Sequence, residues 1–259
     1  MVTRDTAWPQ GTPCWVDIGV TDIPKAKAFY GGLFGWDIQD GPPEAGGYSM
    51  CQIAGQPVAG IGASQGDMPI FWTTYLASQN ADETAAKIKA AGGQVVMDPF
   101  DVMDAGRMFI AVDPGGAFFG VWEANAHTGV RVANEPGSLI WSENMSRAYE
   151  ANKAFYGAVF GYHFGDIGAE GMNYATLDIE GRPVGGIGEI GPEQPAQVPA
   201  SWRTYFAVDD TDAAVARVTE LGGRLIAPAW DSPYGRMAVV SDDQGAVFSL
   251  MSTDGDQDG

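Results

Sequence analysis

The sequence is poor in basic residues and has no long apolar run. Its 259 residues include 14 Lys and Arg against 33 Asp and Glu, which gives a formal net charge of −19. The basic residues are dispersed, whereas proteins that bind nucleic acid or anionic membranes need clusters of them. No apolar run approaches the roughly 20 residues of a membrane-spanning helix, and the first residues lack the apolar core of a signal peptide. These absences argue against nucleic-acid and membrane partners, and they favour a cytoplasmic protein. The sequence leaves the oligomeric state open between a monomer and a homodimer.

Cysteine and histidine are also scarce, with two of each. Cys14 and Cys51 form no CxxC motif, so we expect no disulfide framework. A two-histidine-one-carboxylate iron site, or a His-rich zinc or nickel site, needs imidazoles that converge from different strands. His127 and His163 cannot supply such a site. The chain also lacks GxGxxG, P-loop and GxSxG motifs, so nucleotide binding and a serine nucleophile have no support in the sequence.

The second half of the sequence repeats the first. Residues 15–36 return without a gap as residues 141–162, and both segments contain KAFYG followed by FG and an aromatic residue. Later motifs recur in the same order, at an offset that drifts from 126 to about 130 residues. A repeat of this length indicates a duplicated domain rather than a solenoid unit. It predicts domains over 10–126 and 137–252, joined by a linker within 124–136, where turn-forming residues replace apolar periodicity.

Each half has the pattern of two successive βαβββ units. In the first half, Asp22 is placed to cap a helix that Gly35 ends, and a turn at Gly55 separates two short strands. The expected strands of this half are 15–20, 48–53, 57–61, 71–77, 94–97, 108–112 and 118–122, and its second helix is 81–91. The helices of the second half are expected near 149–160 and 211–221. We expect each half to bury a core of its own, and the polar, acidic tail from Ser252 to be frayed.

These motifs resemble the vicinal oxygen chelate superfamily, which includes glyoxalase I, bleomycin-resistance proteins and extradiol dioxygenases. The resemblance covers about residues 13–251. It rests on four βαβββ units, on FYGGLFGW and its repeat FYGAVFGY, on the Gly-Gly pair after the second helix, and on the DPGGAFF hairpin. The nearest likeness is to two-domain bacterial members of the hydroxylase or glyoxalase-like type. It implies an α+β fold of tandem glyoxalase-like domains, in which two modules pair their curved sheets into a ligand-holding cup.

The resemblance also indicates where metal-using members hold their ion, on the first strand of each module and on the last strand of the domain. The corresponding residues are Trp15, Thr73 and Gly120 in the first half and Trp141, Arg203 and Ser249 in the second. None is a typical ligand of a transition metal, so we predict no metal site and no cofactor. A magnesium or manganese site made only of carboxylates is the alternative.

Aromatic residues are abundant, with 8 tryptophans in the chain. The ligand sites of the family imply that Trp15 and Trp141 face the cups. The complete sets expected to bind ligand are Trp15, Trp72, Tyr75 and Trp122 in the first half, and Trp141, Trp202, Tyr205 and Met251 in the second. Anchoring of a core or of the domain interface is the competing interpretation for each of them. An aromatic cavity with few polar groups suits a flat organic ligand.

Asp17 and Glu143 follow these first-strand tryptophans by two residues and lie on the same strand face. Each either pairs with arginine or backbone donors, or serves as a general base or as the acceptor for a ligand hydroxyl. Arg203, where the first half has Thr73, either pairs with Glu143 or binds an anionic or quinone oxygen. Glu143, Arg203 and Asp17 are therefore the candidate catalytic residues, and the second half ranks first.

Two classes of function follow. The first is a metal-independent small-molecule protein of the glyoxalase or bleomycin-resistance type, which binds or modifies a flat aromatic metabolite or antibiotic-like ligand. The second is a glyoxalase-type lyase, or a dioxygenase-like or hydroxylase-like enzyme, that uses a divalent metal. The scarcity of histidine favours the first class, and the sequence leaves open whether the protein is an enzyme.

Overall fold

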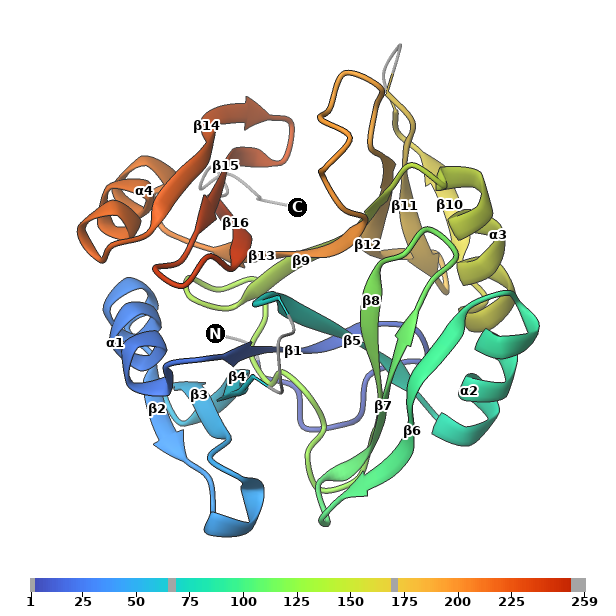
Figure 1. Ribbon diagram of the computed structural model, residues 1–259, viewed down its shortest axis with the longest axis horizontal. Coiled ribbons are helices and arrows are strands. Elements are labelled where there is room, and N and C mark those ends of the chain that lie inside the picture. Colours follow the sequence, from blue (N-terminus) through green and yellow to red (C-terminus); the bar gives the residue numbers. More distant parts are fainter. Residues whose placement is uncertain (1–2, 65–68, 169–171, 253–259) are drawn as a thin grey trace.

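The computed structural model describes residues 3–64, 69–168 and 172–252, and it contains two eight-stranded sheets, one in each half of the chain (Figure 1). Each half is built from two βαβββ modules, which confirms the predicted tandem α+β architecture. The acidic tail after Ser252 lies outside the described residues. Among the described helices, none combines the length and apolar character needed to cross a membrane.

The two halves have the same order of elements. The first half contains β1 (Pro13–Val20), α1 (Ile23–Phe34), β2 (Asp37–Asp40), a 3₁₀ helix (Pro43–Ala45), β3 (Ser49–Ile53), β4 (Gln56–Ala63), β5 (Trp72–Ser78), α2 (Ala81–Ala90), β6 (Gln94–Val102), β7 (Gly106–Val112) and β8 (Phe118–Ala124). The second contains β9 (Leu139–Ser146), α3 (Tyr149–Phe160), β10 (His163–Asp166), β11 (Tyr174–Ile179), β12 (Arg182–Glu189), β13 (Ser201–Ala207), α4 (Thr211–Glu220), β14 (Arg224–Ser232), β15 (Gly235–Ser241) and β16 (Val247–Ser252). The sheet orders are β2-β3-β4-β1-β5-β8-β7-β6 and β10-β11-β12-β9-β13-β16-β15-β14.

Local sequence signals explain where α1 begins and ends. The Asp22 side chain accepts a hydrogen bond from the backbone N–H of Lys25 at 3.0 Å, and Gly35 adopts a left-handed conformation with φ of 68°. Both features agree with the prediction. The sequence pattern missed β2 and β10, because these four-residue strands lie at sheet edges and show no clear alternation of apolar and polar residues.

The two larger hydrophobic cores are shared between the halves, so the expectation of a separate core in each half is wrong for them. A smaller buried cluster around Trp15, Tyr75 and Trp122 lies within the first half and the linker. Figure 1 shows α1 beside α4 on one side of the molecule and α2 beside α3 on the other. One core joins Phe29 and Tyr30 of α1 to Phe206 and Phe248 of the second half. The other joins residues of α2 and β8 to residues of α3. The apolar outer face of each sheet is therefore covered partly by the other half, which makes the two domains one packing unit.

Two reciprocal hydrogen bonds join the halves within these cores. The hydroxyl of Tyr30 donates to Asp242 Oδ2 at 2.8 Å, and the hydroxyl of Tyr156 donates to Asp113 Oδ2 at 2.9 Å. Each tyrosine belongs to an FYG motif, and each aspartate begins the turn between the last two strands of the other half. The duplicated motifs thus recognise each other across the domain interface.

Trp72 and Trp202 belong to these interface networks, so the prediction that they line the cups is wrong. The indole N–H of Trp72 donates to the Tyr30 hydroxyl at 3.1 Å, and that of Trp202 donates to the Tyr156 hydroxyl at 2.7 Å. Both tryptophans are buried in the shared cores. Each lies three residues before a tyrosine of the same strand, and side chains separated by three residues in a strand point to opposite faces.

Candidate functional site

The sheet face opposite the shared cores carries the remaining predicted residues. Strands β1 and β5 place Trp15 opposite Tyr75 and Asp17 opposite Thr73. Strands β9 and β13 repeat the arrangement, with Trp141 opposite Tyr205 and Glu143 opposite Arg203. We call these two faces the first cup (Trp15, Asp17, Tyr48, Thr73, Tyr75, Trp122) and the second cup (Trp141, Glu143, Tyr174, Arg203, Tyr205, Met251).

A carboxylate in each cup is held by two tyrosine hydroxyls. In the first cup, Tyr75 and Tyr48 donate to Oδ2 of Asp17 at 3.1 and 3.3 Å. In the second, Tyr205 donates to Oε1 of Glu143 at 2.7 Å, and Tyr174 donates to its Oε2 at 2.9 Å. The carboxylates are therefore fixed in position by an arrangement that both halves preserve.

Each cup tryptophan extends this network by one hydrogen bond. The indole N–H of Trp15 donates to the Tyr48 hydroxyl at 2.9 Å, and the indole N–H of Trp141 donates to the Tyr174 hydroxyl at 3.0 Å. Neither tyrosine was predicted from the sequence. Their positions differ by the 126-residue offset of the first repeat segment, so a search for every aromatic residue repeated at that offset finds them.

The repeated GIG motif makes room for these tyrosines. A Cβ atom at Gly60 would lie 1.8 Å from the hydroxyl oxygen of Tyr48, and one at Gly186 would lie 2.0 Å from that of Tyr174. No other residue fits at either position without displacing the tyrosine. The glycines on β4 and β12 therefore determine where the hydroxyl groups meet the carboxylates.

The two carboxylates differ in their electrostatic surroundings. Burial raises the pKa of Asp17 to about 7, although the hydrogen bonds from Tyr75 and Tyr48 oppose the shift. The residue opposite Asp17 is Thr73, which carries no positive charge. The Oδ1 atom of Asp17 accepts no hydrogen bond from any residue that the structure describes. Glu143 instead has a guanidinium nitrogen of Arg203 3.8 Å from its Oε1. The first cup thus holds a carboxyl group that titrates near neutrality, and the second holds an acid beside a base.

A linker residue occupies the first cup. The ring of His127 stands edge-on to Trp15, with 4.4 Å between ring centroids, and 5.5 Å from Trp122. The Trp122 indole N–H also donates to the His127 carbonyl at 2.9 Å. Burial lowers the pKa of His127 to about 4, so the imidazole is neutral at pH 7. Trp15 is consequently 3% exposed, whereas its counterpart Trp141 is only half-buried.

The residues at the family's metal-ligand positions do not fit a resident metal ion. A Cβ atom at Gly120 would lie 2.2 Å from the Tyr75 ring, so an acidic side chain there would displace the tyrosine. In the second cup, the corresponding Ser249 lies beside Tyr205, and Arg203 faces Glu143. Across residues 3–64, 69–168 and 172–252, no group of three or more His, Cys, Asp or Glu side chains is arranged to hold a metal.

Comparison with known proteins agrees with this duplicated scaffold. The family model of the glyoxalase/bleomycin resistance protein/dioxygenase superfamily matches residues 14–121 and 145–250. The chain belongs to this superfamily. The assignment confirms the resemblance seen in the sequence, and each matched segment lies within the residue range of one sheet.

Relatives of similar length are known from actinobacteria. The chain is 45% identical to the putative glyoxylase CFP32 of Mycobacterium tuberculosis over 257 residues, covering 96% of this chain and 97% of the relative. It is 36% identical over 264 residues to the anthracycline biosynthesis protein DnrV of Streptomyces peucetius, covering 95% and 94%. These relatives span both domains.

A solved structure with the same fold is the Mn(II)-bound glyoxalase from Novosphingobium aromaticivorans. Its TM-score is 0.67 at 17% identity, and the match covers 95% of this chain and 83% of that one. At this identity the likeness concerns the fold alone.

Proposed function

We propose that this protein binds a flat, partly polar organic molecule in the second cup, without a metal ion at the family's ligand positions. The observation that carries the proposal is the half-buried Trp141 beside a fixed Glu143 and Arg203, where relatives that use a metal place its ligands. The first cup lacks the arginine and is occupied by His127.

The second cup offers both a stacking surface and polar groups for the edge of a ligand. The half-buried Trp141 provides apolar surface, and an aromatic pair contributes about 0.5 to 1.5 kcal/mol beyond its burial. The 3.8 Å separation between Arg203 and Glu143 exceeds a normal hydrogen bond. The guanidinium group of Arg203 makes no hydrogen bond to another described residue, so its N–H groups are free to bind an anionic or quinone oxygen.

The relatives support a polycyclic aromatic ligand. DnrV and its Streptomyces relative DauV are named for anthracycline biosynthesis, and they match nearly the whole chain. Anthracyclines are flat ring systems with hydroxyl and quinone oxygens at their edge, which suits the chemistry of Glu143 and Arg203. On this proposal the protein either sequesters such a molecule or orients it for modification.

The second candidate is a glyoxalase-type lyase or a dioxygenase that uses a divalent metal. The mycobacterial relatives are named putative glyoxylase, which favours it. The family's metal-ligand positions argue against this candidate. They hold Trp141, Arg203 and Ser249, and none of these is a common ligand of a transition metal.

Titration with a hydroxylated anthraquinone tests the proposal. Saturable quenching of tryptophan fluorescence is expected, with an affinity unchanged after chelator treatment. Trp141→Ala should weaken binding about 10-fold or more, equivalent to about 1.4 kcal/mol, and Arg203→Thr, which copies Thr73 of the first half, should also weaken it. The matched control is Trp15→Ala in the first cup, which should leave the affinity unchanged.

Two results would decide against the proposal. A stoichiometric metal ion in the purified protein, removed together with binding or activity by a chelator, would establish the metal-dependent alternative. If Trp141→Ala only lowers the melting temperature and quinone binding persists, Trp141 is a structural anchor and the ligand lies elsewhere.

A further inference from the structure

A cavity between the two halves of the chain adjoins the second cup, because Trp141 is one of the residues that line it. It has a volume of about 200 Å³ and is formed by the N-terminal segment before β1, the linker, and strands β9 and β12. Pairs of residues related by the 126-residue repeat line it together, such as Trp8 with Asn134 and Pro13 with Leu139. The cavity is therefore located where equivalent segments of the two halves face each other.

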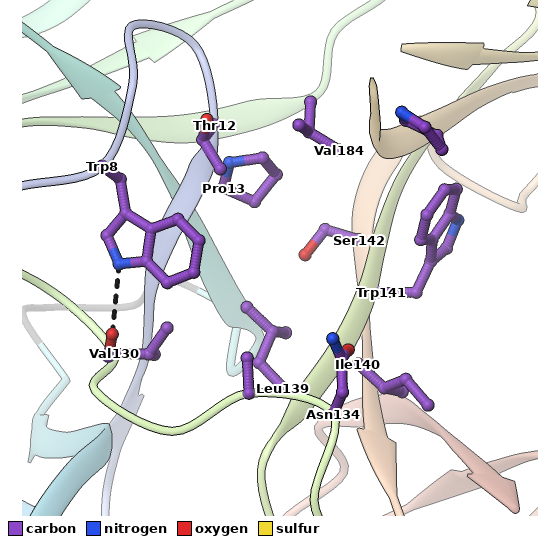
Figure 2. A pocket seen from close by; sticks show the side chains of 12 residues that line it. Trp8, Thr12, Pro13, Val130, Asn134, Leu139, Ile140, Trp141, Ser142 and Val184 are labelled. Atoms are coloured by element: carbon purple, nitrogen blue, oxygen red, sulfur yellow. Dashed lines mark hydrogen bonds between the residues drawn. The ribbon is translucent and has the colours of Figure 1, made fainter. Parts of the chain in front are cut away.

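Two buried hydroxyl groups in the cavity wall have no partner. Ser142 is 1% exposed and Thr12 is 6% exposed, and neither hydroxyl oxygen finds a hydrogen-bond partner among the described residues. Figure 2 shows Ser142 pointing toward Trp8 from the opposite wall. An unpaired buried hydroxyl is costly, so native structures usually satisfy it with protein, water or ligand.

The counterparts of these residues in the other half do not share this feature. Ser142 corresponds to Val16, which has no hydroxyl and is buried in a shared core. Thr12 corresponds to Ser138, whose hydroxyl donates to the Glu135 carbonyl at 2.7 Å. The lack of a partner at Ser142 and Thr12 is therefore not a consequence of the repeated fold.

The other walls of the cavity are apolar, and contacts to neighbouring residues hold the Trp8 side chain in place. The Trp8 indole N–H donates to the Val130 carbonyl at 3.1 Å, as Figure 2 shows, and the Arg4 guanidinium lies 4.8 Å from the ring centroid. Leu139, Pro13 and Val184 add aliphatic surface, and no charged residue is among the twelve that line the cavity. This lining favours an uncharged ligand.

We propose that this cavity is a second ligand site, for an uncharged single-ring molecule that carries a hydroxyl group, such as a phenol. An apolar cavity of about 150 Å³ is enough to hold benzene, so the volume here admits one substituted ring but not a polycyclic quinone. A hydroxyl on that ring both donates and accepts, which matches the two unpaired hydroxyls of Ser142 and Thr12. The proposal does not depend on the function of the cups.

Binding of phenol, compared with toluene of nearly the same shape, tests this site. Calorimetry should show one saturable phenol site, and nuclear Overhauser contacts should connect the bound ring to methyl groups of Leu139 and Val184. Ser142→Val introduces the residue that the first half has at Val16. It should reduce the preference for phenol over toluene about 3- to 10-fold, as expected for the loss of one hydrogen bond.

Thr12→Val provides a second variant if Ser142→Val disturbs folding. The melting temperature of each variant shows whether it is folded. The proposal is overturned if phenol shows no saturable binding, which would mean that water alone fills the cavity. It is also overturned if both variants keep the phenol preference, or if the bound ring contacts the Met251 methyl group of the second cup instead. Failure here leaves quinone binding by the second cup intact.

Discussion

Asp17→Asn should stabilise the protein at alkaline pH and not at acidic pH. Burial raises the pKa of Asp17 from 3.8 to about 7 on folding. A raised carboxyl pKa means that the folded state favours the protonated form, so the contribution of Asp17 to stability is complete below pH 3.8. That contribution is lost as the pH rises through about 7. Asparagine has no charge to lose and keeps a carbonyl oxygen that can accept from both tyrosines.

The size of the effect follows from the shift. A difference of about 3 pKa units corresponds to about 4 kcal/mol as an upper limit. The Asp17 side chain is partly exposed to solvent, and screening by solvent reduces the free energy that a pKa shift represents. We therefore expect Asp17→Asn to raise the free energy of unfolding by about 2 kcal/mol at pH 8, relative to its effect at pH 4.

Urea denaturation of both proteins at several pH values measures this difference. Subtracting the unfolding free energy of the wild type from that of the variant at each pH cancels the contribution of all other titrating groups. Glu143→Gln is the matched change in the second cup, and it should destabilise the protein because it leaves the nearby Arg203 without its partner. A difference between Asp17→Asn and wild type that stays constant from about pH 4 to pH 8 would show that Asp17 does not titrate near neutrality.

Three further variants test other parts of the structure. Tyr30→Phe should cost about 1 to 3 kcal/mol in chemical denaturation, and more than Tyr156→Phe. Asp242 Oδ2 then keeps no described hydrogen-bond donor, whereas Asp113 Oδ2 still accepts from Asn144 and Asn152; equal losses would contradict this account. Gly186→Ala should displace Tyr174 and weaken quinone binding, whereas the matched Gly60→Ala should leave the quinone affinity unchanged. If Gly60→Ala weakens binding more than Gly186→Ala does, the ligand lies in the first cup. His127→Ala should expose Trp15 and so increase collisional quenching of tryptophan fluorescence. If quenching does not increase, another group covers Trp15.

The two cups show how one duplicated scaffold has acquired different chemistry. Both keep the tryptophan, the acid and the two tyrosines, and both keep the glycine that admits the second tyrosine. The residue opposite the acid, Thr73 or Arg203, determines whether a positive charge lies beside it. The cup with the arginine is also the one whose tryptophan is half-buried, whereas Trp15 of the other cup is buried.

Parts of the candidate site could be predicted and parts could not. The pairing of Glu143 with Arg203 was one of two alternatives that the sequence left open, and the structure brings the two side chains together. Trp72 and Trp202 were misplaced even though strand alternation, applied strictly, separates them from Tyr75 and Tyr205. Tyr48 and Tyr174 were overlooked because Tyr48 directly precedes β3 and Tyr174 begins β11, and the register of these strands is known only once they pair with β4 and β12.

The sequence by itself determined the duplication, the βαβββ order and the helix ends, because periodicity, capping residues and glycines act over a few neighbouring residues. The tertiary structure decided which surfaces meet. An apolar face specifies that it must be buried but not which partner covers it. The packing of α1 against α4 and of α2 against α3 was therefore not visible in either repeat. For the same reason, only the fold shows that the linker places His127 over Trp15. The pKa of Asp17 likewise depends on burial by groups that are distant in sequence.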